Sequence, residues 1–486
     1  MNYIELGPER KSFNINMDSS IFGSFAEIGG GQETARFFFQ AGGASHTIAK
    51  TISAYDMALS DNLYGKSSGN RYVSQQRLKK MLSVEFDNLT QVLSGKKESN
   101  VRFFSFANTV SIRNFQKSNE SHGWLGCKFQ LSPEGKPNEV IMHVRLLESE
   151  GIQQQTTLGI LGVNLLYASY YYYDNPTSFI KSLTDSIPKD SIEITMLTMY
   201  GNELDYIDNR LLGVQLVKNH LCPAIIFDRH GLMQQPSDML YKKDVLAFRG
   251  SFRPITYTGF DILRSSYSMC KKEALYSKEN TLALCEITLN NLLEDGKFDE
   301  RDFLERVDIL NGMGQNVMIS NFREYFRLVE YFSLFQLADL RIIMGADTLE
   351  KVMDECYYAD LKGGILEAFG KLFANTTQLY IYPSLNHGKD DLLTSENIRL
   401  SDEVISLYDF LLVNKRIIDL EDYKIQYLDI HSNEVLELIQ AEDDNWEKKV
   451  PVYISECIKK RNLFGYKTKT NDTKHPPCRT TPPDQA

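Results

Sequence analysis

Short apolar runs alternate with helical patterns along most of this chain, and that rhythm constrains the fold more than any other feature. Apolar runs of about four to eight residues between helical stretches of roughly 10 to 15 residues are typical of parallel strands covered by helices on both faces. The sequence therefore predicts an α/β protein with a mostly parallel sheet. The predicted strands are 21–28, 101–107, 125–130, 140–147, 158–166, 192–199, 224–228, 245–252, 281–289, 317–320, 340–344 and 378–382. The predicted helices are 33–40, 45–59, 176–183, 208–220, 259–272, 299–312, 322–335 and 348–358.

The predicted strands are more numerous than one small doubly wound sheet needs, so a (β/α) barrel-like core is the alternative to an open sheet. Interruptions of this strand–helix alternation suggest how the chain is divided, and one near 150–190 would split the core into two subdomains. The expected segments are a polar lead-in at 1–20, an α/β core at 21–385, a small helical C-terminal cap at 398–465 and a disordered tail at 466–486.

The charge and hydropathy of the chain argue against two classes of partner. The formal net charge is −11, and no cluster of Lys and Arg supplies the basic face that a nucleic-acid-binding protein needs. The longest apolar stretch, 158–173, is interrupted by Asn164 and Ser169 and is shorter than the roughly 20 residues of a membrane helix. We therefore expect no nucleic-acid partner and no membrane partner.

The cysteines and the first residues indicate the cytoplasm. The seven cysteines are scattered and include no Cys-x-x-Cys pair, which is typical of reduced thiols and not of a disulfide framework or a zinc site. Glu5, Glu9 and Arg10 lie where an export signal would have its apolar core. No histidine spacing suggests a metal site, and the cofactors stay open.

A glycine-rich turn follows the first predicted strand. Gly29, Gly30 and Gly31 would let the backbone approach a ligand closely, and the N-terminus of the next helix would favour an anion. The pattern is neither a phosphate-binding loop with Gly-Lys-Ser/Thr nor a dinucleotide fingerprint. Glu33 also lies in the first helical turn, where its carboxylate competes with a phosphate for the helix dipole. The turn is therefore either a ligand contact or a tight crossover.

A second glycine pair is better suited to an anion. Gly42 and Gly43 precede Ser45, the expected N-cap of the next helix, and His46 and Lys50 follow in its first turns. Free backbone N–H groups, a hydroxyl and an ammonium are the groups that a phosphate prefers. The same residues would equally end one helix and cap the next.

Two arginines and two carboxylates complete the candidate site. Arg249 and Arg253 would share one face if their segment is extended, and two converging guanidiniums would bind a phosphate or carboxylate. They would equally bind acidic neighbours. Glu286 lies inside an apolar strand, where a carboxylate is costly unless it is paired or used. Glu27 and Glu286 are therefore the candidate catalytic bases.

Four segments, 23–33, 48–57, 122–126 and 248–254, together resemble a bacterial family of uncharacterised proteins of similar length. Its members carry the labels nicotinate- or nicotinamide-nucleotide adenylyltransferase and TonB-dependent receptor. The resemblance extends over about residues 20–465. This chain has no His-x-Gly-His motif of the adenylyltransferases, and it lacks the export signal and amphipathic strands of the receptors. Neither label is supported by its motifs.

Two functions follow from these features. The first is a cytoplasmic enzyme, a transferase by class, that binds a phosphorylated or nucleotide-like metabolite at the glycine turns and the two arginines. The second is a non-catalytic protein that assembles into an oligomer or filament through aromatic surfaces, with Tyr170–Tyr173 and the helix 322–335 as contacts. A homo-oligomer is expected in either case.

Overall fold

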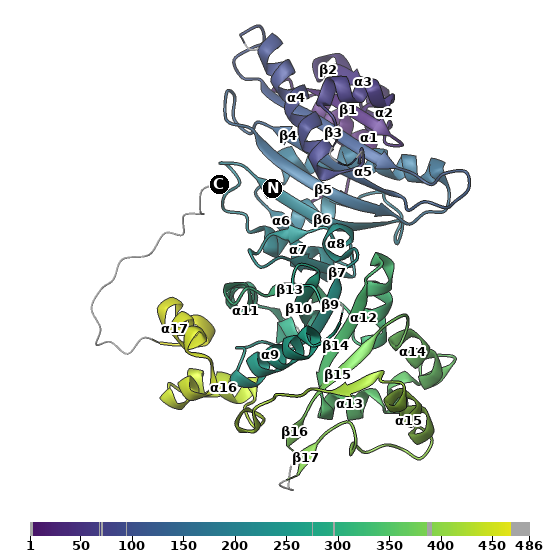
Figure 1. Cartoon of the computed structure of the whole chain (residues 1–486). Helices are drawn as coiled ribbons and strands as arrows, with labels where there is room; N and C mark the ends of the chain where they lie inside the picture. The colour runs from purple at the N-terminus through teal and green to yellow at the C-terminus, as the bar shows by residue number, and fades with distance from the viewer. Residues whose placement is uncertain are drawn as a thin grey trace.

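The computed structural model describes residues 3–67, 69, 71–93, 95–274, 276–294, 297–385 and 391–467. The chain forms two large open sheets with helices around them, so the α/β class and the mostly parallel pairing are confirmed (Figure 1). The barrel-like alternative is not confirmed, because each sheet ends in two edge strands. The predicted disordered tail lies outside the described residues from position 468 onwards. The division into domains stays a prediction.

The first sheet, here called the N-terminal sheet, has the order β2-β1-β3-β4-β5-β6. Strand β1 pairs in parallel with β2 and β3, whereas β3, β4, β5 and β6 follow one another antiparallel. Its strands are β1 (Ile21–Gly29), β2 (Ile48–Ile52), β3 (Arg102–Ser111), β4 (His122–Phe129), β5 (Asn138–Leu146) and β6 (Ile192–Tyr200). Its helices are α1 (Pro8–Asn16), α2 (Thr34–Ala41), α3 (Met57–Tyr64), α4 (Gln75–Leu93), α5 (Gly151–Tyr171) and α6 (Pro176–Leu183).

Helices cover both faces of the N-terminal sheet. Phe104 in β3 contacts the ring of Tyr170 in α5, with the ring centroids 6.3 Å apart. The next residue, Ser105, donates a hydrogen bond of 2.9 Å to the carbonyl of Leu82 in α4. Successive residues of a strand point to opposite faces, so α5 and α4 lie on opposite sides of the sheet. Helices α1 and α2 pack against α5 on the outer side.

Helix α5 corrects the prediction of a strand at 158–166. It packs against β4 on one side and against α1, α2 and α6 on the other, so it is buried nearly all round. A helix buried on every side carries no apolar stripe, and its apolar run looks like a buried strand. No helix of the described chain, α5 included, combines the length and hydropathy needed to cross a membrane.

The predicted helix 45–59 is also wrong. A short 3-10 turn at Ala44–His46 is followed by strand β2, and α3 begins only after Asp56, whose side chain accepts from the backbone N–H of Leu59. Strand β2 pairs in parallel with β1 along Ile48–Ile52. Pairing with a neighbouring strand therefore outweighs the helix-capping signal at Ser45.

The second sheet, here called the C-terminal sheet, has the order β18-β15-β14-β9-β10-β13-β7-β8. All pairings from β18 to β13 are parallel, and β7 and β8 add an antiparallel edge. Its strands are β7 (Ala224–Phe227), β8 (Met233–Gln234), β9 (Asp244–Arg249), β10 (Thr281–Thr288), β13 (Asn316–Ser320), β14 (Asp339–Gly345), β15 (Gln378–Tyr382) and β18 (Ile417–Asp419). Two short hairpins are β11 (Leu293–Glu294) with β12 (Lys297–Phe298) and β16 (Ser384–Leu385) with β17 (Leu392–Leu393).

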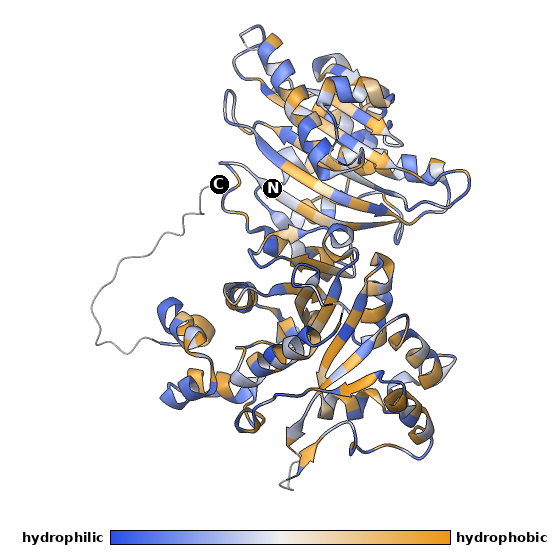
Figure 2. Ribbon diagram, viewed as in Figure 1, coloured by the Kyte–Doolittle hydropathy of each residue, from blue (hydrophilic) through white to orange (hydrophobic). Residues whose placement is uncertain are grey.

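Helices on the two faces of the C-terminal sheet belong to two separate hydrophobic cores. Leu246 and Phe248 of β9 lie in the core shared with α9, α11, α16 and α17, whereas Val245 and Ala247 lie in the core shared with α12, α13, α14 and α15. Strands buried on both faces are mostly hydrophobic along their length, as β14 and β15 are in Figure 2. The helices of this half are α7 (Asn209–Lys218), α8 (Pro236–Leu240), α9 (Tyr257–Lys271), α10 (Leu289–Leu292), α11 (Glu300–Gly312), α12 (Tyr325–Phe332), α13 (Ala346–Val352), α14 (Gly364–Leu372), α15 (Ile405–Val413), α16 (Ser432–Gln440) and α17 (Val452–Arg461).

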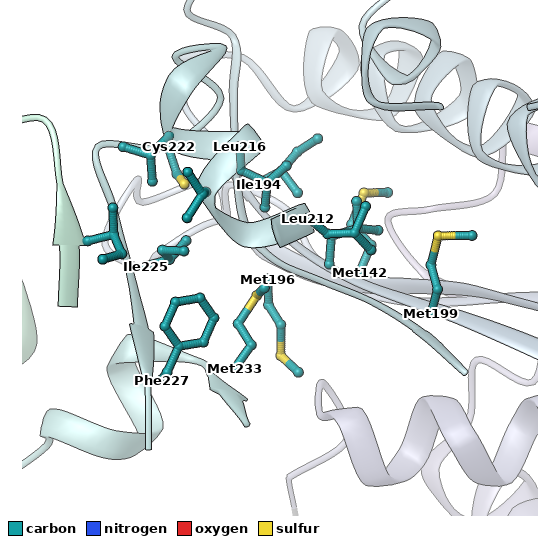
Figure 3. Packing of buried hydrophobic residues seen from close by; sticks show 14 of the residues in the cluster. Met142, Ile194, Met196, Met199, Leu212, Leu216, Cys222, Ile225, Phe227 and Met233 are labelled. Atoms are coloured by element: carbon teal, nitrogen blue, oxygen red, sulfur yellow. The ribbon is translucent and has the colours of Figure 1, made fainter. Parts of the chain in front are cut away.

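The two sheets are joined by a continuous core. Figure 3 shows Met142 and Ile194 of the N-terminal sheet, Leu212 and Leu216 of α7, and Phe227 of β7 packed close together. Each of these side chains is buried. Helix α7 therefore connects the two sheets through packed apolar side chains as well as through the chain itself.

Candidate functional site

The order of the parallel strands creates a switch point in the C-terminal sheet. From β9 the chain proceeds to β10 and then β13 on one side, and it returns to add β14, β15 and β18 on the other side. Counted along the chain from β9, this is the order 3-2-1-4-5-6 of a doubly wound fold. In such sheets ligands bind in the crevice at the carboxyl ends of the two strands where the direction reverses. The crevice here lies between the ends of β9 and β14.

A cavity of about 680 Å³ lies at this switch point. Arg249 ends β9, Gly345 ends β14 and Tyr382 ends β15, and all three line the cavity. The C-terminal region closes its other side with Leu428 and His431. The volume falls in the range of about 300–1,000 Å³ that is usual for small-molecule sites.

Arg249 is a largely buried cation that lines this cavity. Its Nε and Nη2 donate to the two oxygens of Glu286 at 2.8 and 3.0 Å, and its Nη1 donates to the carbonyl of Arg323 at 2.9 Å. Its guanidinium also lies over the ring of Tyr325, 4.3 Å from the centroid. Burial disfavours the cation, but the Glu286 carboxylate outweighs burial and raises the pKa of Arg249 above its usual value. One N–H on each Nη keeps no partner among the described residues, so two donors stay available for a ligand.

Glu286 is placed to hold Arg249. Its carboxylate is fully buried, and it accepts from Ser320 Oγ at 2.5 Å in addition to the two bonds from Arg249. These three donors fix the orientation of the carboxylate. This arrangement suits orientation of the guanidinium better than proton transfer.

Arg253 does not share a face with Arg249. The segment between them is not extended, because Phe252 has φ of +50° and its buried ring lies against Gly250. Arg253 Nε donates to Asp302 at 2.6 Å, so the two arginines have separate carboxylate partners. The expected convergence of two guanidiniums is therefore absent from this loop.

The helix that follows the first glycine turn binds the Glu27 carboxylate at its N-terminus. The Glu27 carboxylate accepts from the backbone N–H groups of Thr34 and Ala35, at the start of α2, and from Asn108 Nδ2. It therefore occupies the position at the helix N-terminus that an anion would take. Gly29 has φ of +79°, a conformation that favours glycine, and the Gly31 carbonyl accepts from Asn108. Gly30 lies between them beside Ile112.

The second glycine pair lies at the surface. Gly42 and Gly43 have φ of +83° and +77°, and Ser45 and His46 are exposed in the turn that follows. Lys50 in β2 forms an ion pair of 2.5 Å with Glu85 of α4. These residues and Glu27 belong to the N-terminal sheet, whereas Arg249, Arg253 and Glu286 belong to the C-terminal sheet. Within the described chain, no hydrogen bond or ion pair joins the two sets.

Glu27 gives the protein a testable pH dependence. Burial raises its pKa to about 7 from a usual value of 4.5, although its hydrogen bonds favour the carboxylate. The folded state then holds the proton more tightly than the unfolded state, so protonation of Glu27 stabilises the fold. This stabilisation is present below pH 4.5 and is lost as the pH rises to about 7. Between pH 5 and pH 8 we expect the unfolding free energy of the wild type to fall by about 2.5 kcal/mol relative to Glu27→Gln, measured by urea denaturation. Parallel pH curves for the two proteins would contradict this assignment.

Two residues of the cavity were not singled out from the sequence. Tyr325 provides the ring beneath Arg249, and Ser384 lines the cavity with a buried hydroxyl that has no hydrogen-bond partner among the described residues. Both follow the carboxyl end of a predicted strand within a few residues, which is the signal that points to them.

Comparisons with known proteins assign this chain to no family. No family model matches the chain, and no curated protein matches it. Solved structures that match in part include the competence/damage inducible protein CihA from Agrobacterium tumefaciens, at 17% identity over 34% of this chain and 93% of that chain, with a TM-score of 0.23. A competence-damaged protein (CinA) superfamily protein from Enterobacter cloacae matches at 11% identity over 38% and 95%, with a TM-score of 0.23. A candidate nicotinate-nucleotide adenylyltransferase from Vibrio parahaemolyticus matches at 13% identity over 46% and 95%, with a TM-score of 0.24. At these scores the likenesses carry no argument about function.

Proposed function

We propose that the protein binds a phosphorylated or nucleotide-like metabolite in the switch-point cavity, with Arg249 contacting its anionic group. The observation that carries this proposal is a buried guanidinium held by Glu286 at the end of the central strand, with two donors left over. A guanidinium held in this way is preorganised for bidentate contact with a phosphate or carboxylate.

The surroundings of α9 favour a mononucleotide-sized ligand over a dinucleotide. In dinucleotide-binding folds the pyrophosphate lies at the N-terminus of the helix after the first strand. Here Thr258, in the first turn of α9, donates to the carbonyls of Tyr427 and Ile430, and the ring of Tyr257 stacks on Tyr427 at 4.8 Å. The C-terminal region therefore covers that helix end, and the anionic group is assigned to Arg249.

A transferase is the reaction class that we propose for this site. The cavity also contains the carboxylates of Asp347, Glu350 and Asp429, which are the groups available for a general-base step on a second substrate. Glu286 has the positioning role described above. Glu27 lies in the N-terminal sheet and does not line this cavity, so we give it no part in a reaction there.

The binding proposal predicts a ligand-dependent thermal shift. AMP, ATP, NAD⁺, ribose 5-phosphate and inorganic phosphate are the probes, and a binder at a hundredfold excess over its Kd stabilises the folded state by about 2.7 kcal/mol. We expect at least one organic phosphate to raise the melting temperature of the wild type. The variant Arg249→Met/Glu286→Gln removes both charges of the buried pair, and it should lose the shift.

A matched control lies at the other end of the same sheet. Arg341 of β14 pairs with Glu273, away from the cavity, so Arg341→Met/Glu273→Gln removes another arginine–glutamate pair of this sheet and should keep the shift. Loss of the shift in both double variants, or in neither, would argue against Arg249 as the ligand contact.

No specific observation favours the assembly alternative. Tyr170 and Tyr172 are 5% and 2% exposed, and Phe326 and Phe332 of α12 are 3% and 0% exposed. The aromatic residues expected to form contacts between subunits therefore contribute to the cores. Absence of a shift with every probe, together with large species by light scattering that grow with concentration, would support assembly.

A further inference from the structure

A second cavity, of about 490 Å³, lies between the N-terminal sheet and α8. His122 and Trp124 of β4 and His143 and Arg145 of β5 line it from the sheet. Side chains of the β8–α8 region, Ser237 and Asp238 among them, line it from the opposite side. It shares no lining residue with the switch-point cavity.

A chain of hydrogen bonds orients the two histidines. Nδ1 of His122 lies 3.1 Å from Nε2 of His143, and Nδ1 of His143 lies 2.6 Å from the hydroxyl of Thr195. Both nitrogens of His143 are therefore engaged, and Nε2 of His122 is the ring nitrogen without a partner among the described residues. A hydrogen bond at one ring nitrogen fixes the tautomer and hence the role of the other. When Nδ1 of His122 donates to His143, Nε2 of His122 is an acceptor.

An irregularity in β6 places Thr195. His143 pairs with Met196 and the next residue, Val144, pairs with Ile194, so Thr195 is the extra residue of a β-bulge. A bulge changes the direction of a side chain locally, and bulges are common next to functional sites. Here it allows the Thr195 hydroxyl to reach His143, which is buried at 1% exposure.

The charged groups of the cavity are balanced. Arg71 pairs with Asp238 at 3.2 Å, and Arg145 pairs with Glu193 at 2.5 Å. Glu120 is the remaining charged residue of the lining. Burial lowers the pKa of both His122 and His143. For His122 burial outweighs Glu120 and Asp238, whose charges favour the protonated ring. Both rings are therefore neutral near pH 7. The cavity is thus polar without a strong field of one sign.

We propose that this cavity is a second ligand site, which binds a small uncharged molecule bearing hydroxyl groups, with Nε2 of His122 accepting a hydrogen bond from one of them. Paired charges and neutral imidazoles suit a polyol or sugar better than an anion. In the arrangement where His122 Nδ1 donates to His143 Nε2 and His143 Nδ1 donates to the Thr195 hydroxyl, His143 and Thr195 are positioning residues that leave Nε2 of His122 as the acceptor.

Chemical modification of the full-length protein tests the site. Diethyl pyrocarbonate attacks an unprotonated ring nitrogen, so we expect modification at His122 and at the exposed His230, and none at His143, by peptide mass spectrometry. D-Ribose, myo-inositol and glycerol are the probes. At about ten times its Kd, a probe that binds should slow modification of His122 about tenfold by mass action and leave His230 unchanged.

Two variants separate binding from structural effects. Ser237→Leu fills the cavity from the α8 side, and we expect slow modification of His122 with no further protection by a probe. Thr195→Val removes the hydroxyl and should give mixed tautomers of His122 in long-range ¹H–¹⁵N spectra, whereas Thr195→Ser should restore the single tautomer. The proposal is overturned if none of the three probes protects His122, or if protection persists in Ser237→Leu. Unchanged spectra in Thr195→Val would remove the positioning role.

Discussion

Replacing Arg249 with alanine is expected to lower the unfolding free energy by about 3–5 kcal/mol, because it leaves the Glu286 carboxylate buried without its cation. Glu286 has 0% exposure, and among the described residues it would keep only the hydrogen bond from Ser320. Truncation also removes the guanidinium from the ring of Tyr325. Urea denaturation followed by circular dichroism measures the change.

Two further variants show whether the loss comes from the unpaired charge. Arg249→Met/Glu286→Gln removes both charges and should recover most of the stability, because a neutral pair carries no desolvation penalty of this size. Arg249→Lys keeps a cation but cannot form the bidentate contact, so we expect an intermediate loss. A loss below about 1 kcal/mol for the alanine variant would mean that water solvates Glu286 in the folded state.

Replacing Lys11 with methionine should have a comparable effect at the other end of the molecule, about 3–5 kcal/mol. The Lys11 side chain is fully buried, and its Nζ contacts Asp185 at 2.7 Å, Asn164 at 2.7 Å and the carbonyl of Ser182 at 2.9 Å. Burial lowers the pKa of Lys11 to about 8 despite the opposing effect of Asp185. The variant would leave the Asp185 carboxylate, 2% exposed, with the hydroxyl of Tyr3 as a remaining donor.

The loss in Lys11→Met should be accompanied by loosening of α1. Lys11 connects α1 to α5 and to the end of α6, so we expect faster amide hydrogen exchange in α1 than in the wild type. Arg10→Met is the matched control, because its side chain is exposed on the same helix and its replacement should change stability by less than about 0.5 kcal/mol. Equal stability of the two variants would rule out the buried ion pair as the cause.

The sequence predicts the C-terminal sheet well, for a physical reason. Most of its parallel strands are isolated apolar runs with a helix further along the chain, so periodicity identifies both, as at 281–289 and 299–312. Strand β18 is not predicted, because it has only three residues. Periodicity fails at α5, which is buried nearly all round, and at β2, which has only five residues. The order of the strands is set by contacts between distant segments, and no local pattern contains it.

The candidate site could be predicted only in part. Arg249 and Glu286 are conspicuous singly, because each is a charge in or beside an apolar strand. Their pairing requires the knowledge that β9 and β10 are neighbours, and Arg249 then lies directly beside Glu286 in the register. Gly29, Gly42 and Gly43 do have positive φ, but the carboxylate of Glu27 binds the N-terminus of the helix that follows the first turn. The cavity wall provided by Leu428 and His431 comes from a region whose sequence shows no such role.

The strand order 3-2-1-4-5-6 also determines how the C-terminal sheet can assemble during synthesis. Strand β9 emerges before the other parallel strands and lies between their two halves, so β10 and β13 extend one side and β14, β15 and β18 the other. Each new parallel strand adds to an edge that already exists, and none has to insert between two strands that are paired. Only β7 and β8, which precede β9, must wait for β13 before they find a partner in this sheet. A nascent chain can therefore build this sheet from its centre outwards, while the β7–β8 hairpin stays unpaired with the sheet until β13 is made.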